Sequence, residues 1–204
     1  MLPLGVAIDA TVRVRELKSL LAPPPDRPGK DWEVSFELLP TLYDFFGACM
    51  IVTTFSFHSL EAFANDLLDR NERRTFTVTY RDKQVQMTSE QVEKQFPAEA
   101  KLDSVLKEAL GLPSLRSDQS KLWQRFQEMK SVRDGIAHTK SCGHYLHHKQ
   151  ESSKRLPIDR ESIYFKFLNK DIEGFPRLVL QIMRVFAHPA SDVVFKEAEA
   201  RLAG

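Results

Sequence analysis

The stretch "SVRDGIAHTK", residues 131–140, brings an arginine, a carboxylate and a histidine close together in the chain. The planar guanidinium of an arginine such as Arg133 suits the oxygens of a phosphate. A histidine such as His138 can take up and release protons near neutral pH, because its ordinary pKa lies there. Asp134 follows the arginine directly. These residue types suit cleavage of a phosphodiester by its own 2′-OH group, which needs proton transfer and charge stabilisation but no metal ion.

The helix that must position these residues is predicted from about Ser117 to His138. Its apolar stripe consists of Leu122, Phe126 and Met129 at helical spacing. Arg133 occupies the next position of that stripe, where a guanidinium needs a carboxylate or an anionic ligand beside it. The alternative is a last turn that has left the core, with Arg133 and Asp134 as solvated charges.

The direction of His138 is a second problem. In an unbroken helix it would lie about 140° around the axis from Arg133, so one helix cannot aim both side chains at one small ligand. Either the helix distorts near Gly135, or two copies of the chain combine their arginines and histidines; we favour the second. His138 could also be a simple C-terminal cap. The spacing alone carries no weight, because it arises by chance in a chain of this composition.

A long apolar helix is predicted from Thr41, with a capping box to Asp44, to about Arg70. On it His58, Glu61 and Asn65 form a polar line at positions i, i+3 and i+7. Arg133 would be a natural partner, with Glu61 supplying a carboxylate and Asn65 a hydrogen bond. The alternative is that this line faces solvent.

The remaining pattern predicts one domain, residues 1–204, that is an all-α bundle with a small β-hairpin insertion at residues 75–87. Helices are expected at about Ala7–Leu21, from Thr88 or Ser89 to Phe96, in "AKLDSVLKEALGLP" up to Gly111, and at about Asp171–Ala187. The segment "DWEVSFELLP" is ambiguous and "SIYFKFL" reads as a strand. Residues 140–157 are predicted to be a basic loop.

Composition limits the function further. The chain is 42% hydrophobic and 28% charged, which is typical of a globular protein. Its net charge is only +1, so any affinity for nucleic acid must come from a local basic patch. Two cysteines make no disulfide framework. The absence of a basic, apolar leader and the short charge-free run Phe45–Leu60 predict a cytoplasmic protein without a membrane span.

The basic loop offers a place for single-stranded RNA. Lys140 and its basic neighbours could contact phosphates, and Tyr145 could stack on a base. A solvated loop is the alternative. The cysteine and histidines there, Cys142, His144, His147 and His148, match no common zinc spacing, so we expect no metal and no cofactor.

Two segments together, "SLEAFAND" on the long helix and "SVRDGIAH", resemble the HEPN superfamily. The resemblance implies an all-α bundle that pairs as a homodimer and, in many members, a metal-independent endoribonuclease of toxin–antitoxin or defence systems. By position, Arg133 and His138 match the catalytic pair of the family, Asp134 the polar residue between them, and Glu61 the acidic residue of the long helix.

One departure from the family pattern concerns regulation. Members that are controlled by nucleotidylation carry a tyrosine two residues after the histidine, whereas this chain has Lys140. A partner of that type is therefore not expected, although an antitoxin or another protein partner remains compatible with the resemblance. The second hypothesis is a non-catalytic HEPN domain that binds nucleic acid or a protein.

Overall fold

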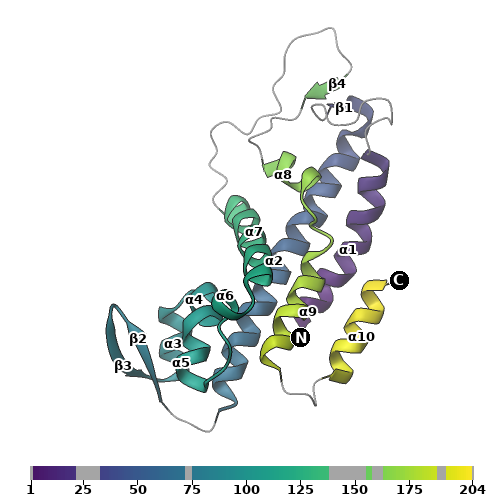
Figure 1. Cartoon of the computed structure of the whole chain (residues 1–204). Coiled ribbons are helices and arrows are strands. Elements are labelled where there is room, and N and C mark those ends of the chain that lie inside the picture. The colour runs from purple at the N-terminus through teal and green to yellow at the C-terminus, as the bar shows by residue number, and fades with distance from the viewer. Residues whose placement is uncertain are drawn as a thin grey trace. The chain divides into compact units, whose positions relative to one another are not determined.

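The computed structural model describes residues 2–21, 33–71, 75–137, 155–157, 163–187 and 192–203. Most of these residues are helical, and four short strands pair as two antiparallel sheets (Figure 1). The prediction of a mostly α fold with a small β insertion is therefore confirmed.

The longer helices are α1 (Leu2–Leu21), α2 (Leu39–Asp69), α7 (Ser120–Ala137), α9 (Phe175–Phe186) and α10 (Asp192–Ala203). The shorter helical segments are η1 (Phe36–Leu38), α3 (Ser89–Gln95), α4 (Ala98–Ala100), the π-helical η2 (Lys101–Val105), α5 (Leu106–Leu110), α6 (Leu115–Asp118) and α8 (Ile163–Asn169). The strands are β1 (Glu33–Ser35), β2 (Phe76–Tyr80), β3 (Lys83–Met87) and β4 (Arg155–Pro157).

The chain divides into two compact units, and the division falls inside α2, α7 and α9. The first unit comprises Met1–Phe55 and Met129–Pro176, and the second comprises Ser56–Glu128 and Arg177–Gly204. Each unit is described by itself below. The expectation of a single domain stays a prediction.

In the first unit α1 runs alongside the first half of α2 (Figure 1). The core contains Phe46, whose ring lies 5.8 Å from that of Phe45 and 6.1 Å from that of Phe167 on α8. Cys49 is fully buried, and burial raises the pKa of its thiol far above the ordinary value, with the negative charge of Glu173 adding to the effect. This cysteine is therefore a packing residue with no thiolate at neutral pH.

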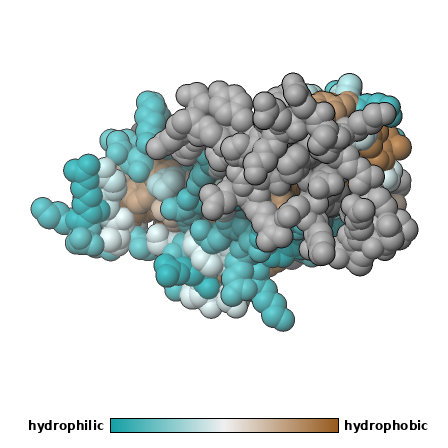
Figure 2. Space-filling model, turned by 90° about the horizontal axis from the view of Figure 1, so that it is seen from above, coloured by the Kyte–Doolittle hydropathy of each residue, from teal (hydrophilic) through white to brown (hydrophobic). Residues whose placement is uncertain are grey.

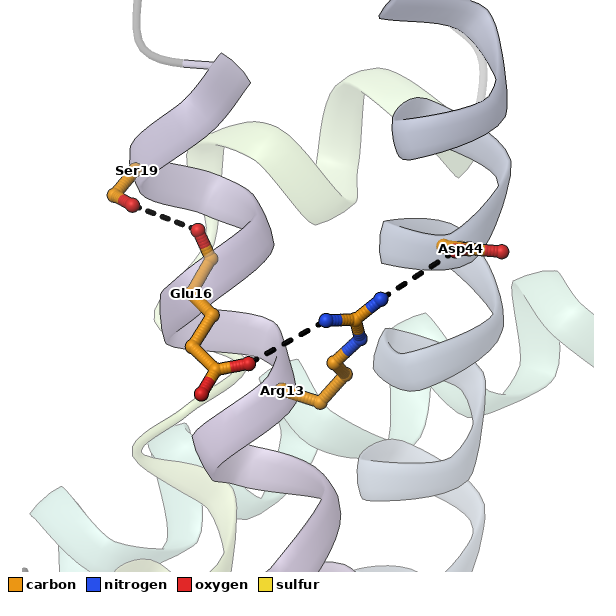
Figure 3. Close-up of polar contacts among 4 residues, drawn as sticks. All are labelled: Arg13, Glu16, Ser19 and Asp44. Atoms are coloured by element: carbon orange, nitrogen blue, oxygen red, sulfur yellow. Dashed lines mark hydrogen bonds and ion pairs between the residues drawn. The ribbon is translucent and has the colours of Figure 1, made fainter.

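Two kinds of ion pair join the helices of the first unit. Arg13 on α1 lies between Glu16 of the same helix and Asp44 on α2, each at 3.5 Å (Figure 3). These side chains are more than half exposed, so their pairing adds little stability. Lys18 donates to both carboxylate oxygens of Glu173 at 3.1 and 3.2 Å in a less exposed place. This pair ties α1 to the turn that precedes α9.

The second unit contains the hairpin, the short helical segments from α3 to α6, α9 from Arg177 on, and α10. The backbone N–H of Thr79 on β2 donates to Glu108 of α5 at 2.5 Å, which attaches the hairpin to that helix. Phe57 of α2 stacks on Phe126 of α7 with a centroid distance of 6.0 Å. Arg184 of α9 binds Glu199 of α10 through two contacts of 2.6 and 2.9 Å.

Local sequence signals account for the short elements of this unit. Thr88, one of the two predicted starting residues, is the N-cap of α3, and it forms a full capping box with Gln91. Gly111 ends α5 in the left-handed conformation with φ 69°, also as predicted. The hairpin turn consists of Arg81 and Asp82, with φ values of 50° and 62°. Two positive φ values are those of a type I′ turn, which matches the twist of the strands.

Several predicted boundaries were wrong. The first helix begins at Leu2, before the predicted Ala7, and Thr41 is not an N-cap, because η1 runs directly into α2 at Leu39. The ambiguous segment before it forms β1 and η1. The "SIYFKFL" segment is the helix α8 and not a strand, and α10 was not predicted. The end of the predicted basic loop forms β4, which pairs with β1.

α2 is apolar enough to raise the question of a membrane span. By length and composition alone, Phe36–Asp69 is able to cross a membrane, and 39% of its most apolar window is buried within the protein. This is weak evidence, since core helices have the same composition. The expectation of a cytoplasmic protein without a membrane span stays a prediction.

Candidate functional site

The helix that carries Arg133 is regular to its end. α7 continues through Gly135 to Ala137, so the distortion near the glycine that would redirect the histidine is not seen in the described part of the helix. His138 itself lies outside the described residues. The combination of Arg133 and His138 between two copies of the chain therefore stays a prediction.

Arg133 is held by charged neighbours on its own helix. Its Nη1 lies 3.1 Å from Oδ1 of Asp134, and Oδ2 of Asp134 accepts from Lys130 Nζ at 3.1 Å. The side chain of Arg133 is 30% exposed and its Nε is buried. Val132 and Met129 beside it are buried. Arg133 and Asp134 therefore lie at the edge of the core, between the predicted buried position and the alternative of solvated charges.

The three side chains form a cluster with two cations and one anion, which we call the α7 charge cluster (Lys130, Arg133 and Asp134). Each of its side chains is between 27% and 33% exposed. The Asp134 carboxylate fixes one end of the guanidinium and leaves the cluster with a net positive charge. Such a cluster can attract and orient a phosphate group.

The polar line on α2 is partly accessible. His58 is exposed, whereas Glu61 and Asn65 are half-buried. These three residues belong to the second unit, and Arg133 and Asp134 belong to the first. The predicted contact between Glu61 and Arg133 therefore stays a prediction.

The observed partner of Asn65 is a lysine that the sequence analysis did not single out. Lys101, at the start of η2, is fully buried and donates from Nζ to Oδ1 of Asn65 at 2.8 Å and to the carbonyl oxygen of Glu93 at 3.2 Å. Burial lowers the pKa of Lys101, while the carboxylates of Glu61 and Glu93 oppose that shift.

A sequence signal for Lys101 exists. It stands three residues after Ala98 and four before Val105, and both are buried, so it occupies a position on the apolar face of its helical segment. A lysine on an apolar face indicates a buried partner, in the same way as Arg133 on the stripe of α7.

The remaining predicted site residues belong to the predicted basic loop. Lys140 and Tyr145 lie outside the described residues, as do Cys142 and the histidines of the basic loop. Within the described ranges, no group of three or more histidine, cysteine, aspartate or glutamate side chains is arranged to hold a metal ion.

Comparison with protein-family models found no match for the chain, and neither curated proteins nor solved structures gave one.

Proposed function

We propose that the protein is a metal-independent endoribonuclease of the HEPN type, acting in a toxin–antitoxin or defence setting as a homodimer. The observation that carries this proposal is the state of Arg133. It is a partly exposed cation, held by Asp134 at 3.1 Å on the regular end of α7, five positions before a histidine. A held arginine is pre-organised to bind a phosphate, which a freely moving surface arginine is not.

The chemistry follows from the residue types. His138 takes the proton of the 2′-OH group, and the 2′-oxygen attacks the adjacent phosphorus. The bond from phosphorus to the 5′-oxygen breaks, and the departing oxygen receives a proton from a histidine. The products are a 2′,3′-cyclic phosphate and a free 5′-hydroxyl group. Arg133 stabilises the charge that gathers on the phosphate oxygens in the transition state.

The proposed homodimer brings an Arg133 and a His138 to the same phosphate. In an unbroken helix the side chains of Arg133 and His138 would point about 140° apart, so in our proposal each site takes its arginine from one copy and its histidine from the other. Glu61 and Asn65 on α2 offer a carboxylate and an amide to bound RNA, and the segment with Lys140 and Tyr145 offers further contacts to the RNA strand.

The test is RNA cleavage by purified protein in excess EDTA. Wild type should cleave single-stranded RNA and leave 2′,3′-cyclic phosphate ends. Arg133→Ala and His138→Ala should each lower the cleavage rate at least about a hundredfold, because this is the typical contribution of a charge-stabilising or proton-transferring group. Arg116→Ala is the matched control, because Arg116 is an exposed arginine on α6, outside the α7 charge cluster. An unchanged rate in folded Arg133→Ala and His138→Ala proteins would contradict the proposal.

One observation favours a second candidate, a non-catalytic HEPN domain that binds nucleic acid or a protein. Asp134 contacts both cations of the α7 charge cluster and so offsets part of the positive charge that a cleaving site needs. Under this candidate, wild type binds RNA or a protein partner and leaves the RNA intact. The same EDTA assay separates the two, since only the first candidate produces cyclic phosphate ends.

A further inference from the structure

Lys101 places a positive charge inside the second unit, where it has two direct acceptors. One is the side-chain oxygen of Asn65 at 2.8 Å and the other is the backbone carbonyl of Glu93 at 3.2 Å. The side chain of Lys101 is 0% exposed. A ligand therefore cannot reach its ammonium group, and any role of Lys101 in binding must pass through Asn65.

The contact with Lys101 decides how the amide of Asn65 is oriented. An ammonium group has only donors, so the atom of Asn65 that faces it must be the oxygen. The Nδ2 group then faces away from Lys101, and within the described residues it has no hydrogen-bond partner. Asn65 is half-buried, so part of the residue is open to solvent. The arrangement presents a fixed N–H donor beside Glu61 and His58 on α2.

We propose that Lys101 is a positioning residue, which fixes the side chain of Asn65 so that its Nδ2 donates a hydrogen bond to bound RNA. This inference rests on the proposed RNA-directed function. The acceptor on the RNA is a phosphate or base oxygen. Lys101 itself does not touch the RNA.

Two features of Lys101 exceed what packing alone needs. Burying an ammonium group costs several kcal/mol in general, and an apolar side chain of similar volume often stabilises a protein more. Lys101 also begins η2, a π-helical segment, and π-helical turns within α-helices are frequently found at functional sites. Both features make sense if the lysine is kept for the orientation of Asn65.

The test measures binding without cleavage. His138→Ala protein is titrated onto a fluorescently labelled single-stranded RNA of mixed sequence, alone and combined with Asn65→Ala, Asn65→Asp, Lys101→Met, or both Asn65→Ala and Lys101→Met. Lys107→Met is the matched control, because Lys107 is an exposed lysine on the neighbouring α5. Thermal unfolding of each variant shows which proteins are folded.

We expect Asn65→Ala and Lys101→Met each to weaken RNA binding by roughly tenfold, which is the loss of one hydrogen bond to a charged group. The double variant should bind no more weakly than either single variant, because the two residues act through one amide. Asn65→Asp should stay folded, since it keeps an acceptor for Lys101, yet bind RNA at least as weakly as Asn65→Ala. Lys107→Met should bind like the parent.

The inference is overturned if Asn65→Asp binds RNA like the parent, or if the effects of Asn65→Ala and Lys101→Met multiply in the double variant. A purely structural lysine would lower the thermal midpoint of Lys101→Met and leave the RNA affinity unchanged. If Lys101→Met does not fold, the Asn65→Asp result decides alone. Failure of the parent to bind RNA also overturns the inference. Binding with the expected pattern but no cleavage by wild type overturns only the ribonuclease.

Discussion

Burial of the Lys101 ammonium group should make the free energy of unfolding depend on pH. Burial lowers its pKa from the ordinary value of 10.5, against the opposing carboxylates of Glu61 and Glu93. A lysine with a lower pKa in the folded state binds fewer protons there than in the unfolded chain, at pH values between the two pKa values. The penalty that the buried charge of Lys101 places on the free energy of unfolding is therefore relieved as the pH increases through that window, and it is fully relieved only above the unfolded pKa.

This predicts a pH dependence that Lys101→Met removes. The free energy of unfolding of wild type, measured with urea from neutral pH to pH 10.5, should rise relative to that of Lys101→Met over the upper part of the range. The sign follows from proton binding, since the unfolded wild type binds more protons. A difference between the two proteins that stays constant with pH, or falls, would show that the pKa of Lys101 is not lowered.

The residues of the candidate site differ in how far the sequence could predict them. Arg133 was predictable because the apolar stripe of α7 continues through the buried Met129 and leads to it. Its tie to Asp134 was not, because sequence spacing does not fix the side-chain rotamers that bring Nη1 within 3.1 Å of a carboxylate. Lys101 was missed because a single lysine in a short amphipathic segment usually faces solvent.

Hydrophobic periodicity predicted the long helices correctly. It failed for segments whose secondary structure depends on packing against neighbouring elements. The segment of α8 is rich in aromatic and β-branched residues, which favour a strand. In the structure Phe167 and Leu168 are both buried. Adjacent residues of a strand point to opposite faces, so a helix buries this pair more readily in one core. α10 was missed although Phe195 and Leu202 are buried seven residues apart, a helical spacing.

The hairpin turn leads to a stability prediction. Asp82 has φ 62°, which costs a non-glycine residue roughly 1 kcal/mol relative to glycine. Asp82→Gly should therefore raise the free energy of unfolding by about 1 kcal/mol, because type I′ turns favour glycine at this position. Urea unfolding monitored by circular dichroism measures the change.

Asp82→Ala is the matched control for the turn. It removes the same carboxylate but keeps a Cβ atom at positive φ, so it should not stabilise the protein. Equal effects of glycine and alanine would show that the charge, and not the backbone conformation, determines the outcome.

The proposed homodimer concerns the molecule as a whole. The described surface in Figure 2 is mainly hydrophilic, with hydrophobic side chains in places. Large apolar side chains are nevertheless exposed on α1, η1 and α2 of the first unit: Leu2, Val6, Val12, Leu20, Phe36, Tyr43, Met50 and Ile51. Tyr43 and Met50 lie seven residues apart and so share one face of α2. Exposed apolar helix faces of this kind suit a contact with another helix.

The net charge of +1 gives the whole chain little general attraction for RNA. Binding must depend on local groups, such as the α7 charge cluster and the polar line of α2. In our proposal the site is complete only when two copies meet, because each copy supplies a group that the other lacks.

The most direct test of this shared site is a mixing experiment. Arg133→Ala and His138→Ala proteins are each assayed for RNA cleavage in EDTA, and then assayed after incubation together. In a mixed dimer one site combines the intact Arg133 of one copy with the intact His138 of the other. Our account predicts that each variant alone is inactive and that the mixture cleaves RNA. An inactive mixture, with wild type active and subunit exchange shown by size-exclusion chromatography of differently tagged copies, would contradict it.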